Sequence, residues 1–388
     1  MALRIVIDAR HIKDFGVGTY IRNLIRALGA VDRENHYILP MRAEDVHEFD
    51  GLPANFETVA YVPSGSRLAN QIAFPRFLKH QGGDLFHLPL NIVPFGMPRP
   101  YVVTIHDLSS LLFASGTGMR ENLQLYLFRR GLLKADRVIA VSGATRRDVE
   151  QMLGIPSDRV RLVYSAPDPK FLDTHPPAAA RGAGPDVWEM EKKRLLERYQ
   201  IDYPFLLYSG RIRPHKNIPR LVEAFAVVRG EMENHPKYHN LKLIIIGDEI
   251  SKHPEVRRAV IQTRTEQAVR FLGFVPFDTL KVFYTTAEAF VFPSLYEGFG
   301  LPPLEAMASG TPVICSNASS LAEAVANAAM IINPENVFDI ARGIREVLLD
   351  PAVRTDLVAA GFRQVRQFSW NRTAAEVLEV YREVAGRH

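Results

Sequence analysis

Residues 294–313 read SLYEGFGLPPLEAMASGTPV and follow a short apolar run. Pro302 and Pro303 suit the first turn of a helix, where their missing N–H groups would have no partner in any case. Gly310 suits the left-handed position that ends a helix. The stretch therefore predicts a strand, a glycine-rich loop and a helix in succession, which is the unit from which α/β folds are built.

This loop carries a carboxylate on each side, with Glu297 at the strand end and Glu305 expected in the first helical turn. Both could accept hydrogen bonds from the hydroxyls of one ligand. Alternatively, Glu305 complements the helix dipole and Glu297 is a surface charge. Backbone N–H groups at the positive helix end would face a phosphate or polyhydroxyl ligand. The residues that offer them are Gly298, Phe299, Gly300 and Leu301.

Short apolar runs alternate with helical patterns through most of the chain, which predicts parallel sheets covered on both faces. The strand candidates are 3–7, 36–41, 101–105, 137–141, 160–164, 205–208, 241–246, 269–272, 290–292 and 312–315. The helix candidates are 17–28, 119–134, 188–199, 217–228, 338–348 and 371–384. The fold class is therefore α/β, with two doubly wound, Rossmann-like domains.

A chain of 388 residues is too long for one ordinary core. Residues 173–186, DTHPPAAARGAGPD, show no periodicity and indicate a linker. We expect an N-terminal Rossmann-like domain over 1–172, then a linker and connecting helix over 173–200. A C-terminal Rossmann-like domain should follow over 201–370, and a helix over 371–388 should return to the first domain.

Composition excludes several classes of protein. A single cysteine rules out a disulfide framework and favours a reducing, cytoplasmic location. Charges interrupt the N-terminus too early for a signal peptide, and no apolar run approaches the roughly 20 residues of a membrane span. The net charge of +4 fits an anionic ligand or the inner face of a membrane. It does not argue for a nucleic-acid partner.

Two further loops could bind phosphate. Arg211 and Lys216 follow the strand candidate 205–208, and the alternative is a solvated basic loop. Gly16 and Gly18 lie between the first strand and helix and match only part of the dinucleotide-binding glycine pattern, so a tight turn is the simpler interpretation.

His106 ends the strand candidate 101–105, which predicts a side chain at the ligand-binding edge or, alternatively, a satisfied core histidine. The chain contains no P-loop, no H-E-x-x-H, no G-x-S-x-G and no D-x-D. We therefore expect neither a metal ion nor a cofactor.

Together these residues resemble the retaining glycosyltransferases of family 4, also called glycosyl transferase group 1. The most specific match is the E-x7-E pattern, EGFGLPPLE at 297–305, supported by SGRIRPHKN at 209–217, IHD at 105–107 and AVS at 140–142. The resemblance implies a GT-B fold, in which two Rossmann-like domains face each other across a cleft. It also implies that the domain over 1–172 binds the acceptor and that the domain over 201–370 binds the sugar nucleotide. Residues 290–325 look especially like the bacterial mannosyltransferase branch, which implies transfer of mannose from GDP-mannose.

The resemblance also implies a role for each candidate residue. The catalytic set would be His106, which would touch the sugar near its anomeric carbon, Arg211 and Lys216, which would bind the diphosphate, and Glu297, which would hold the sugar hydroxyls. The donor would also be bound by Gly16 and Gly18 at the phosphates, by Gly298, Phe299, Gly300 and Leu301 at the sugar, by Glu305 at the ribose and by Val275 at the base.

The sequence departs from the family in its Gly-Val-Gly loop and in lacking an acidic residue near Asn327. Both departures weaken the assignment of a particular donor. UDP-glucose or UDP-N-acetylglucosamine is the alternative donor. A phosphorylase, an epimerase and a non-catalytic nucleotide-sugar-binding protein also remain as alternatives. The acceptor would be a saccharide or a lipid-linked saccharide. Residues 67–79 suit either a helix in peripheral contact with a membrane or an ordinary packed helix bent at Pro75.

Overall fold

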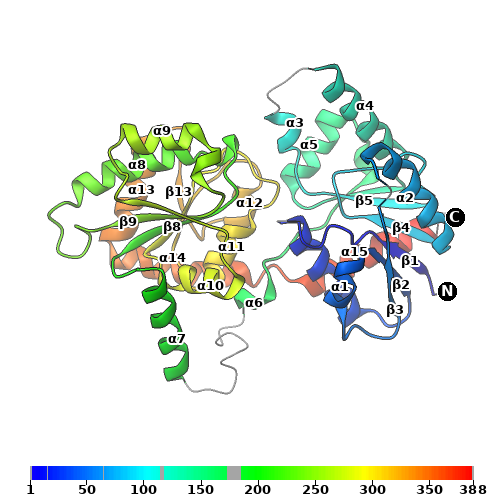
Figure 1. The fold of residues 1–388 in the computed structure, drawn as a ribbon, viewed down its shortest axis with the longest axis horizontal. Helices are drawn as coiled ribbons and strands as arrows, with labels where there is room; N and C mark the ends of the chain where they lie inside the picture. Colours follow the sequence, from blue (N-terminus) through cyan, green and yellow to red (C-terminus); the bar gives the residue numbers. More distant parts are fainter. Residues whose placement is uncertain (1, 15, 64, 114–117, 173–184, 387–388) are drawn as a thin grey trace. The chain divides into compact units, whose positions relative to one another are not determined.

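The computed structural model describes residues 2–386 except 15, 64, 114–117 and 173–184 (Figure 1). The chain forms two compact units. Unit 1 comprises Met1–Ala166 and Phe368–His388, and unit 2 comprises Pro167–Gln367. Most of the predicted linker, residues 173–184, lies outside the described residues.

Unit 1 is built on a seven-stranded parallel sheet in the order β3-β2-β1-β4-β5-β6-β7. The strands are β1 (Arg4–Ile7), β2 (His36–Met41), β3 (Phe56–Ala60), β4 (Leu85–Leu88), β5 (Tyr101–Ile105), β6 (Arg137–Ala140) and β7 (Val160–Leu162). Its helices of at least eight residues are α1 (Val17–Val31), α2 (Arg67–Gln81), α4 (Met119–Lys134), α5 (Gly143–Leu153) and α15 (Trp370–Ala385). Short turns of helix are α3 (Ser109–Leu112), η1 (Ala43–Phe49) and η2 (Ser157–Arg159).

Unit 2 repeats the plan with six parallel strands in the order β10-β9-β8-β11-β12-β13. The strands are β8 (Phe205–Gly210), β9 (Lys242–Gly247), β10 (Val269–Gly273), β11 (Ala289–Phe292), β12 (Val313–Ser316) and β13 (Met330–Ile332). Its helices are α6 (Pro169–Leu172), α7 (Pro185–Arg198), α8 (Ile218–Glu231), α9 (Pro254–Gln262), α10 (Phe277–Thr286), α11 (Leu301–Ala308), α12 (Leu321–Val325), α13 (Val337–Leu349) and α14 (Pro351–Val365), with 3₁₀ turns η4 (Pro214–Lys216) and η5 (Ile250–Lys252).

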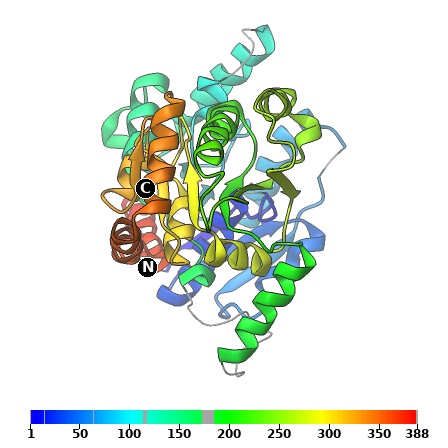
Figure 2. The same ribbon diagram turned by 90° about the vertical axis from the view of Figure 1, so that its left-hand side faces the viewer.

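The two sheets explain why the strands read as unbroken apolar runs. Every residue of β5, β8 and β11 is buried, because helices cover both faces of each sheet. In unit 2, α8, α9 and α13 lie on one side of the sheet, and α10 and α14 lie on the other (Figures 1 and 2). The predicted α/β class with two doubly wound, Rossmann-like domains is confirmed.

The C-terminal helix α15 packs on α1 in unit 1. His87 on β4 joins it to the sheet, since its Nδ1 lies 2.7 Å from Tyr381 Oη and its Nε2 lies 2.8 Å from Thr104 Oγ1. Burial lowers the pKa of His87 to about 3, so this histidine is a neutral structural bridge.

Helix α2 is an ordinary packed helix that contains Pro75, because Phe74 and Leu78 on it are buried in the core of unit 1. Three short strands, β3, β4 and β13, were not among the strand candidates. None of the helices that the structure describes is both long enough and apolar enough to cross a membrane.

Candidate functional site

The candidate residues of unit 2 gather where its strand order reverses. From β8 the chain runs outward through β9 and β10 on one side and, from β11, through β12 and β13 on the other. Ligands of such sheets bind at the carboxyl ends of the strands beside this switch point. The loop after β8 carries Arg211 and Lys216, and the loop after β11 carries Glu297.

Lys216 and Glu297 form an ion pair between these two loops. Lys216 Nζ lies 2.5 Å from both Oε1 and Oε2 of Glu297, and only 17% and 10% of the two side chains are exposed. The ammonium also lies over the ring of Phe292, 5.4 Å from its centroid. The residue expected to bind phosphate and the one expected to bind sugar are thus neighbours, 81 positions apart in sequence.

The main chains of the two loops are also joined. Leu295 N–H donates to the carbonyl of His215 at 2.7 Å. Asn217, which follows η4, donates from its side-chain amide to Pro293 O at 3.2 Å and to Pro334 O at 2.6 Å. Because hydrogen bonds brace both loops, the position of Lys216 relative to Glu297 is fixed by more than the ion pair itself.

Helix α11 begins as the prolines predicted. Pro302 and Pro303 lie in its first turn, and Gly310 follows its end with a φ of 75°, so both expectations are confirmed. Gly300 precedes the helix with a φ of 106°, and a Cβ there would lie 2.7 Å from Leu321 Cδ2. Since the prolines carry no N–H, Leu301 alone among the first three helical residues offers a donor at this helix end.

Glu305 lies in the second turn of α11, so its expected place in the first turn was wrong. The helix begins at Leu301, one residue before the two prolines, and this start places Glu305 beyond the first turn. Tyr284 Oη on α10 donates to Glu305 Oε2 at 3.2 Å. Burial, with a smaller contribution from the charge of Asp168, raises the pKa of Glu305 to about 8. At neutral pH this carboxyl is therefore mainly protonated, whereas Glu297 is paired with a cation.

Arg211 follows β8 and Val275 follows β10, two strands that are separated in the sheet by β9. The side chain of Arg211 is exposed, and the adjoining Ile212 N–H is held by Asp248 Oδ2 at 2.8 Å. Val275 follows β10, and its side chain is buried while that of the preceding Phe274 is 77% exposed. Val275 is thus covered by its neighbours, and its contact with a ligand stays a prediction.

The remaining candidates belong to unit 1. His106 follows β5, and its Nε2 must donate to the carbonyl of Pro89 at 3.0 Å because a carbonyl only accepts. Its ring packs against Tyr20, with 4.7 Å between the ring centroids. Burial lowers the pKa of His106, so it is neutral at physiological pH and leaves the lone pair on Nδ1.

The local backbone explains why glycine occupies positions 16 and 18. Gly16 has a φ of 78°, and a Cβ on Gly18 would lie 2.2 Å from the carbonyl oxygen of Ile12. Phe15, within the same loop, lies outside the described residues. The close approach of the chain to itself accounts for Gly18, which supports the tight-turn interpretation without excluding a phosphate contact.

Sequence reasoning missed four residues that organise this centre, namely Asn217, Tyr284, Ser319 and Ser320. The two serines follow strand β12, so the rule that found Glu297 could also have found them. Tyr284 carried no such signal, because its contact with Glu305 depends on how α10 packs against α11.

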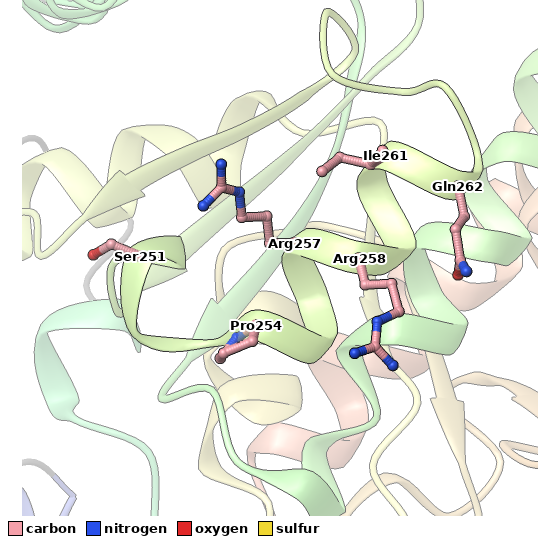
Figure 3. Close-up of a pocket in the computed structure, with 6 residues that line it drawn as sticks. All are labelled: Ser251, Pro254, Arg257, Arg258, Ile261 and Gln262. Atoms are coloured by element: carbon pink, nitrogen blue, oxygen red, sulfur yellow. The ribbon is translucent and has the colours of Figure 1, made fainter.

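Two surface hollows lie apart from these residues. One of about 320 Å³ on α9 is lined by Ser251, Pro254, Arg257, Arg258, Ile261 and Gln262. Figure 3 shows the guanidinium groups of Arg257 and Arg258 pointing in opposite directions, so they do not converge on an anion. The other is lined by four residues of α7. Within the described parts of the chain, His, Cys, Asp and Glu side chains form no cluster of three that could hold a metal ion.

Comparisons with known proteins agree with this geometry. The profile described as Glycosyltransferase Family 4 matches residues 16–171, and that described as Glycosyl transferases group 1 matches residues 191–364. The chain is 30% identical to O-antigen chain mannosyltransferase B of Escherichia coli over 302 residues, which are 77% of this chain and 74% of that protein. The chain is also similar to serotype-specific mannosyltransferase WbdA of Escherichia coli, at 31–32% identity, but the match covers only 33–35% of that longer protein.

Solved structures share the fold along the whole chain. Sucrose-phosphate synthase of Thermosynechococcus elongatus aligns with a TM-score of 0.75 at 23% identity, covering 100% of both chains. HepE of Anabaena in complex with UDP-glucose aligns with a TM-score of 0.75 at 20% identity, covering 98% of this chain and 100% of that one. Since family profiles match both units and the relative from E. coli aligns over most of its length, the chain belongs to family 4 of the retaining glycosyltransferases, which have the GT-B fold.

Proposed function

We propose that this glycosyltransferase transfers mannose from GDP-mannose to a saccharide or a lipid-linked saccharide. The ion pair of Lys216 with Glu297 at the switch point carries the proposal, because it sets a cation for a diphosphate beside a carboxylate for sugar hydroxyls. The choice of mannose is supported by the similarity to O-antigen chain mannosyltransferase B.

In this proposal Arg211 and Lys216 bind the diphosphate of the donor. The negative charge on the diphosphate grows as the glycosidic bond breaks, so fixed cations stabilise the transition state more than the ground state. In the ligand-free protein Glu297 neutralises Lys216. An arriving phosphate would share the ammonium, and the carboxylate of Glu297 would then be available to the sugar hydroxyls.

The other candidate residues would complete the donor site. The N–H groups of residues 298–301 would bind the sugar together with Glu297, and Val275 would line the base. Glu305, which is mainly protonated at neutral pH, can both donate to and accept from the ribose hydroxyls. From unit 1, Gly16 and Gly18 would approach the phosphates, and the neutral His106 would lie near the anomeric carbon.

Isothermal calorimetry with GDP and UDP tests the donor, followed by turnover of GDP-mannose, UDP-glucose and UDP-N-acetylglucosamine. We expect tighter binding of GDP and turnover of GDP-mannose. Tighter UDP binding would support the alternative donors, which the structural similarity to the UDP-glucose complex of HepE favours. Binding of a nucleotide sugar without any transfer or hydrolysis would support a non-catalytic protein.

We also propose that transfer needs no metal ion, because Arg211, Lys216 and backbone N–H groups would neutralise the diphosphate. Activity in excess EDTA should then stay within about twofold of the control, since the fixed cations remain in place. Loss of activity in EDTA that Mn²⁺ restores would overturn this part of the proposal.

A lipid-linked acceptor would bring the protein to a membrane, and α4 offers a suitable face. Leu125, Phe128 and Leu132 of this helix pack toward the core of unit 1. Elsewhere on the helix, Leu123 and Tyr126 are 57% and 58% exposed. Arg130 and Lys134 follow Tyr126 at intervals of four residues and so lie on the same side of the helix, whereas Arg129 donates from Nε to Leu153 O at 2.8 Å. A mixed apolar and cationic face is typical of helices that bind anionic lipid surfaces.

A further inference from the structure

The carbonyl oxygen of Glu297 accepts two hydrogen bonds from neighbouring serines. Ser319 Oγ and Ser320 Oγ each donate to it at 2.8 Å. Both serines belong to the turn between β12 and α12, and Ser320 is fully buried. Two hydroxyls from one turn therefore fix a single peptide group of the loop that carries Glu297.

The same segment contacts the loop at both of its ends. Ser316 Oγ, at the end of β12, donates to the carbonyl of Ser294 at 2.5 Å. Leu321, which follows the two serines, fills the space beside Gly300. The segment 316–321 thus lies along the loop from Ser294 to the start of α11.

Fixing this carbonyl also fixes the direction of the next N–H. In a trans peptide the C=O and N–H groups point in opposite directions, so the N–H of Gly298 points away from the serines. The side chain of Glu297 is held separately by Lys216. If a donor phosphate draws Lys216 away, the two serine bonds still hold the main chain of Glu297.

Ser319 adopts a backbone conformation that is uncommon for serine, with a φ of 54°. Non-glycine residues persist in this region only where surrounding contacts impose it, and such residues cluster at functional sites. Glycine would fit this conformation without strain but has no hydroxyl. The position therefore keeps a side chain that is unfavourable for the backbone and useful for its hydrogen bond.

We propose that Ser319 and Ser320 are positioning residues that hold Glu297 and the N–H of Gly298 in the orientation that binds the donor sugar. The inference rests on the proposed role of Glu297. The serines themselves do not contact the substrate in this proposal, because their hydroxyls donate to the carbonyl of Glu297.

Ser319→Gly is the decisive variant, because it relieves the backbone strain while removing one hydroxyl. We expect its melting temperature to equal or exceed that of the wild type, and its kcat for sugar transfer to fall by roughly tenfold. GDP affinity should not change, because the nucleotide does not contact Glu297 in the proposed site. The double variant Ser319→Gly/Ser320→Ala should lose about a hundredfold in kcat.

Arg264→Gly is the matched control, since Arg264 has the same φ of 54° and lies in the turn after α9. It should gain similar stability and keep full kcat. If Ser319→Gly also keeps full kcat, the positioning role is overturned.

Hydrogen–deuterium exchange provides a readout that needs no donor. Amides of residues 294–300 should exchange faster in the double variant than in the wild type, and those of α8 should not change. Unchanged exchange in residues 294–300 would overturn the inference whatever the donor is. A wild-type protein that transfers no sugar, together with faster exchange in the variant, would instead count against the proposed function alone.

Discussion

At the scale of single residues, the ion pair of Lys216 with Glu297 is the feature that most directly links structure to chemistry. Both charges are largely removed from water, so each depends on the other in the absence of a ligand. In the proposed function a diphosphate would change this balance, because Lys216 would then have two anionic partners. Before a donor binds, the pair would keep the proposed site ordered and electrically neutral.

The first prediction concerns Lys216→Ala. Loss of a fixed cation that faces growing charge should lower kcat by about 10²–10³-fold, and KM for the donor should change less. Lys237→Ala is the control, because Lys237 pairs at 2.9 Å with Glu288, a largely buried carboxylate outside the proposed site. Steady-state kinetics of both variants, with circular dichroism to verify folding, measure the difference. An effect of Lys216→Ala on KM alone would contradict the assigned role.

The second prediction concerns Glu305, whose pKa burial raises to about 8 from an ordinary value near 4.5. The native state then binds more protons than the unfolded state between these values. The contribution of this group to stability is fully present below about pH 4.5 and is lost as the pH rises through about 8. Glutamine does not titrate. Glu305→Gln should therefore become more stable relative to the wild type between pH 5 and 8, by at most about 1.4 kcal/mol per pH unit.

Urea unfolding of both proteins at several pH values measures this trend. Glu288→Gln is a control with the opposite sign, because hydrogen bonds and charges from Lys237 and Arg354 lower the pKa of Glu288. That variant should lose stability relative to the wild type as the pH rises towards the ordinary glutamate pKa of 4.5, and the difference should stay constant above it. A pH-independent difference for Glu305→Gln would show that its carboxyl is ionised in the folded protein.

At the scale of secondary-structure elements, the conformation of the chain at the start of α11 depends on a glycine. Gly300 combines a positive φ with close packing against α12. The third prediction is that Gly300→Ala destabilises the protein by about 1–3 kcal/mol, through backbone strain and the contact with Leu321. It should also impair donor binding, because the N–H of Leu301 would shift.

Gly230→Ala is the control for this prediction. Gly230 lies in the last turn of α8, and an added Cβ would contact nothing within 4 Å. That change should be neutral or stabilise by up to about 1 kcal/mol, because alanine is the better helix former. Thermal denaturation of both variants tests the contrast. Equal effects of the two substitutions would exclude a special role for Gly300.

The elements also show how far the sequence could predict this structure. The bounds of β5 and α4 were predicted to the residue, because Pro100 and the apolar run after it mark the strand and a continuous helical pattern marks the helix. Strand β3 was missed since it lies at the sheet edge and its residues are half-buried or exposed. The pairing of Lys216 with Glu297 could not be read from spacing, because it requires β8 and β11 to be neighbours.

At the scale of the whole molecule, unit 1 is completed by a segment that is distant in sequence. Helix α15 belongs to unit 1 although more than 200 residues separate it from the last strand of that unit. Arg137 on β6 and Arg161 on β7 both bind Glu383 of α15, at 3.3 and 2.8 Å. The C-terminal helix therefore belongs to unit 1, which also carries His106 and α4.

The fourth prediction concerns the membrane face of α4. The protein should co-sediment with vesicles of phosphatidylglycerol and phosphatidylcholine, and not with phosphatidylcholine alone, because its cations need an anionic surface. Added salt should weaken binding by screening these charges. Leu123→Glu/Tyr126→Glu should abolish co-sedimentation and leave GDP affinity unchanged, since no residue of the proposed donor site lies on α4.

Ile261→Glu is the matched control, because Ile261 is 52% exposed on α9 in unit 2 and this change also adds a negative charge to an exposed apolar residue. It should bind vesicles as the wild type does. Sedimentation equilibrium without lipid separates the membrane from a second copy of the chain as the occupant of this face. A wild-type dimer that the α4 variant dissociates, with no vesicle binding by either protein, would show that the face joins two copies and would contradict the membrane contact.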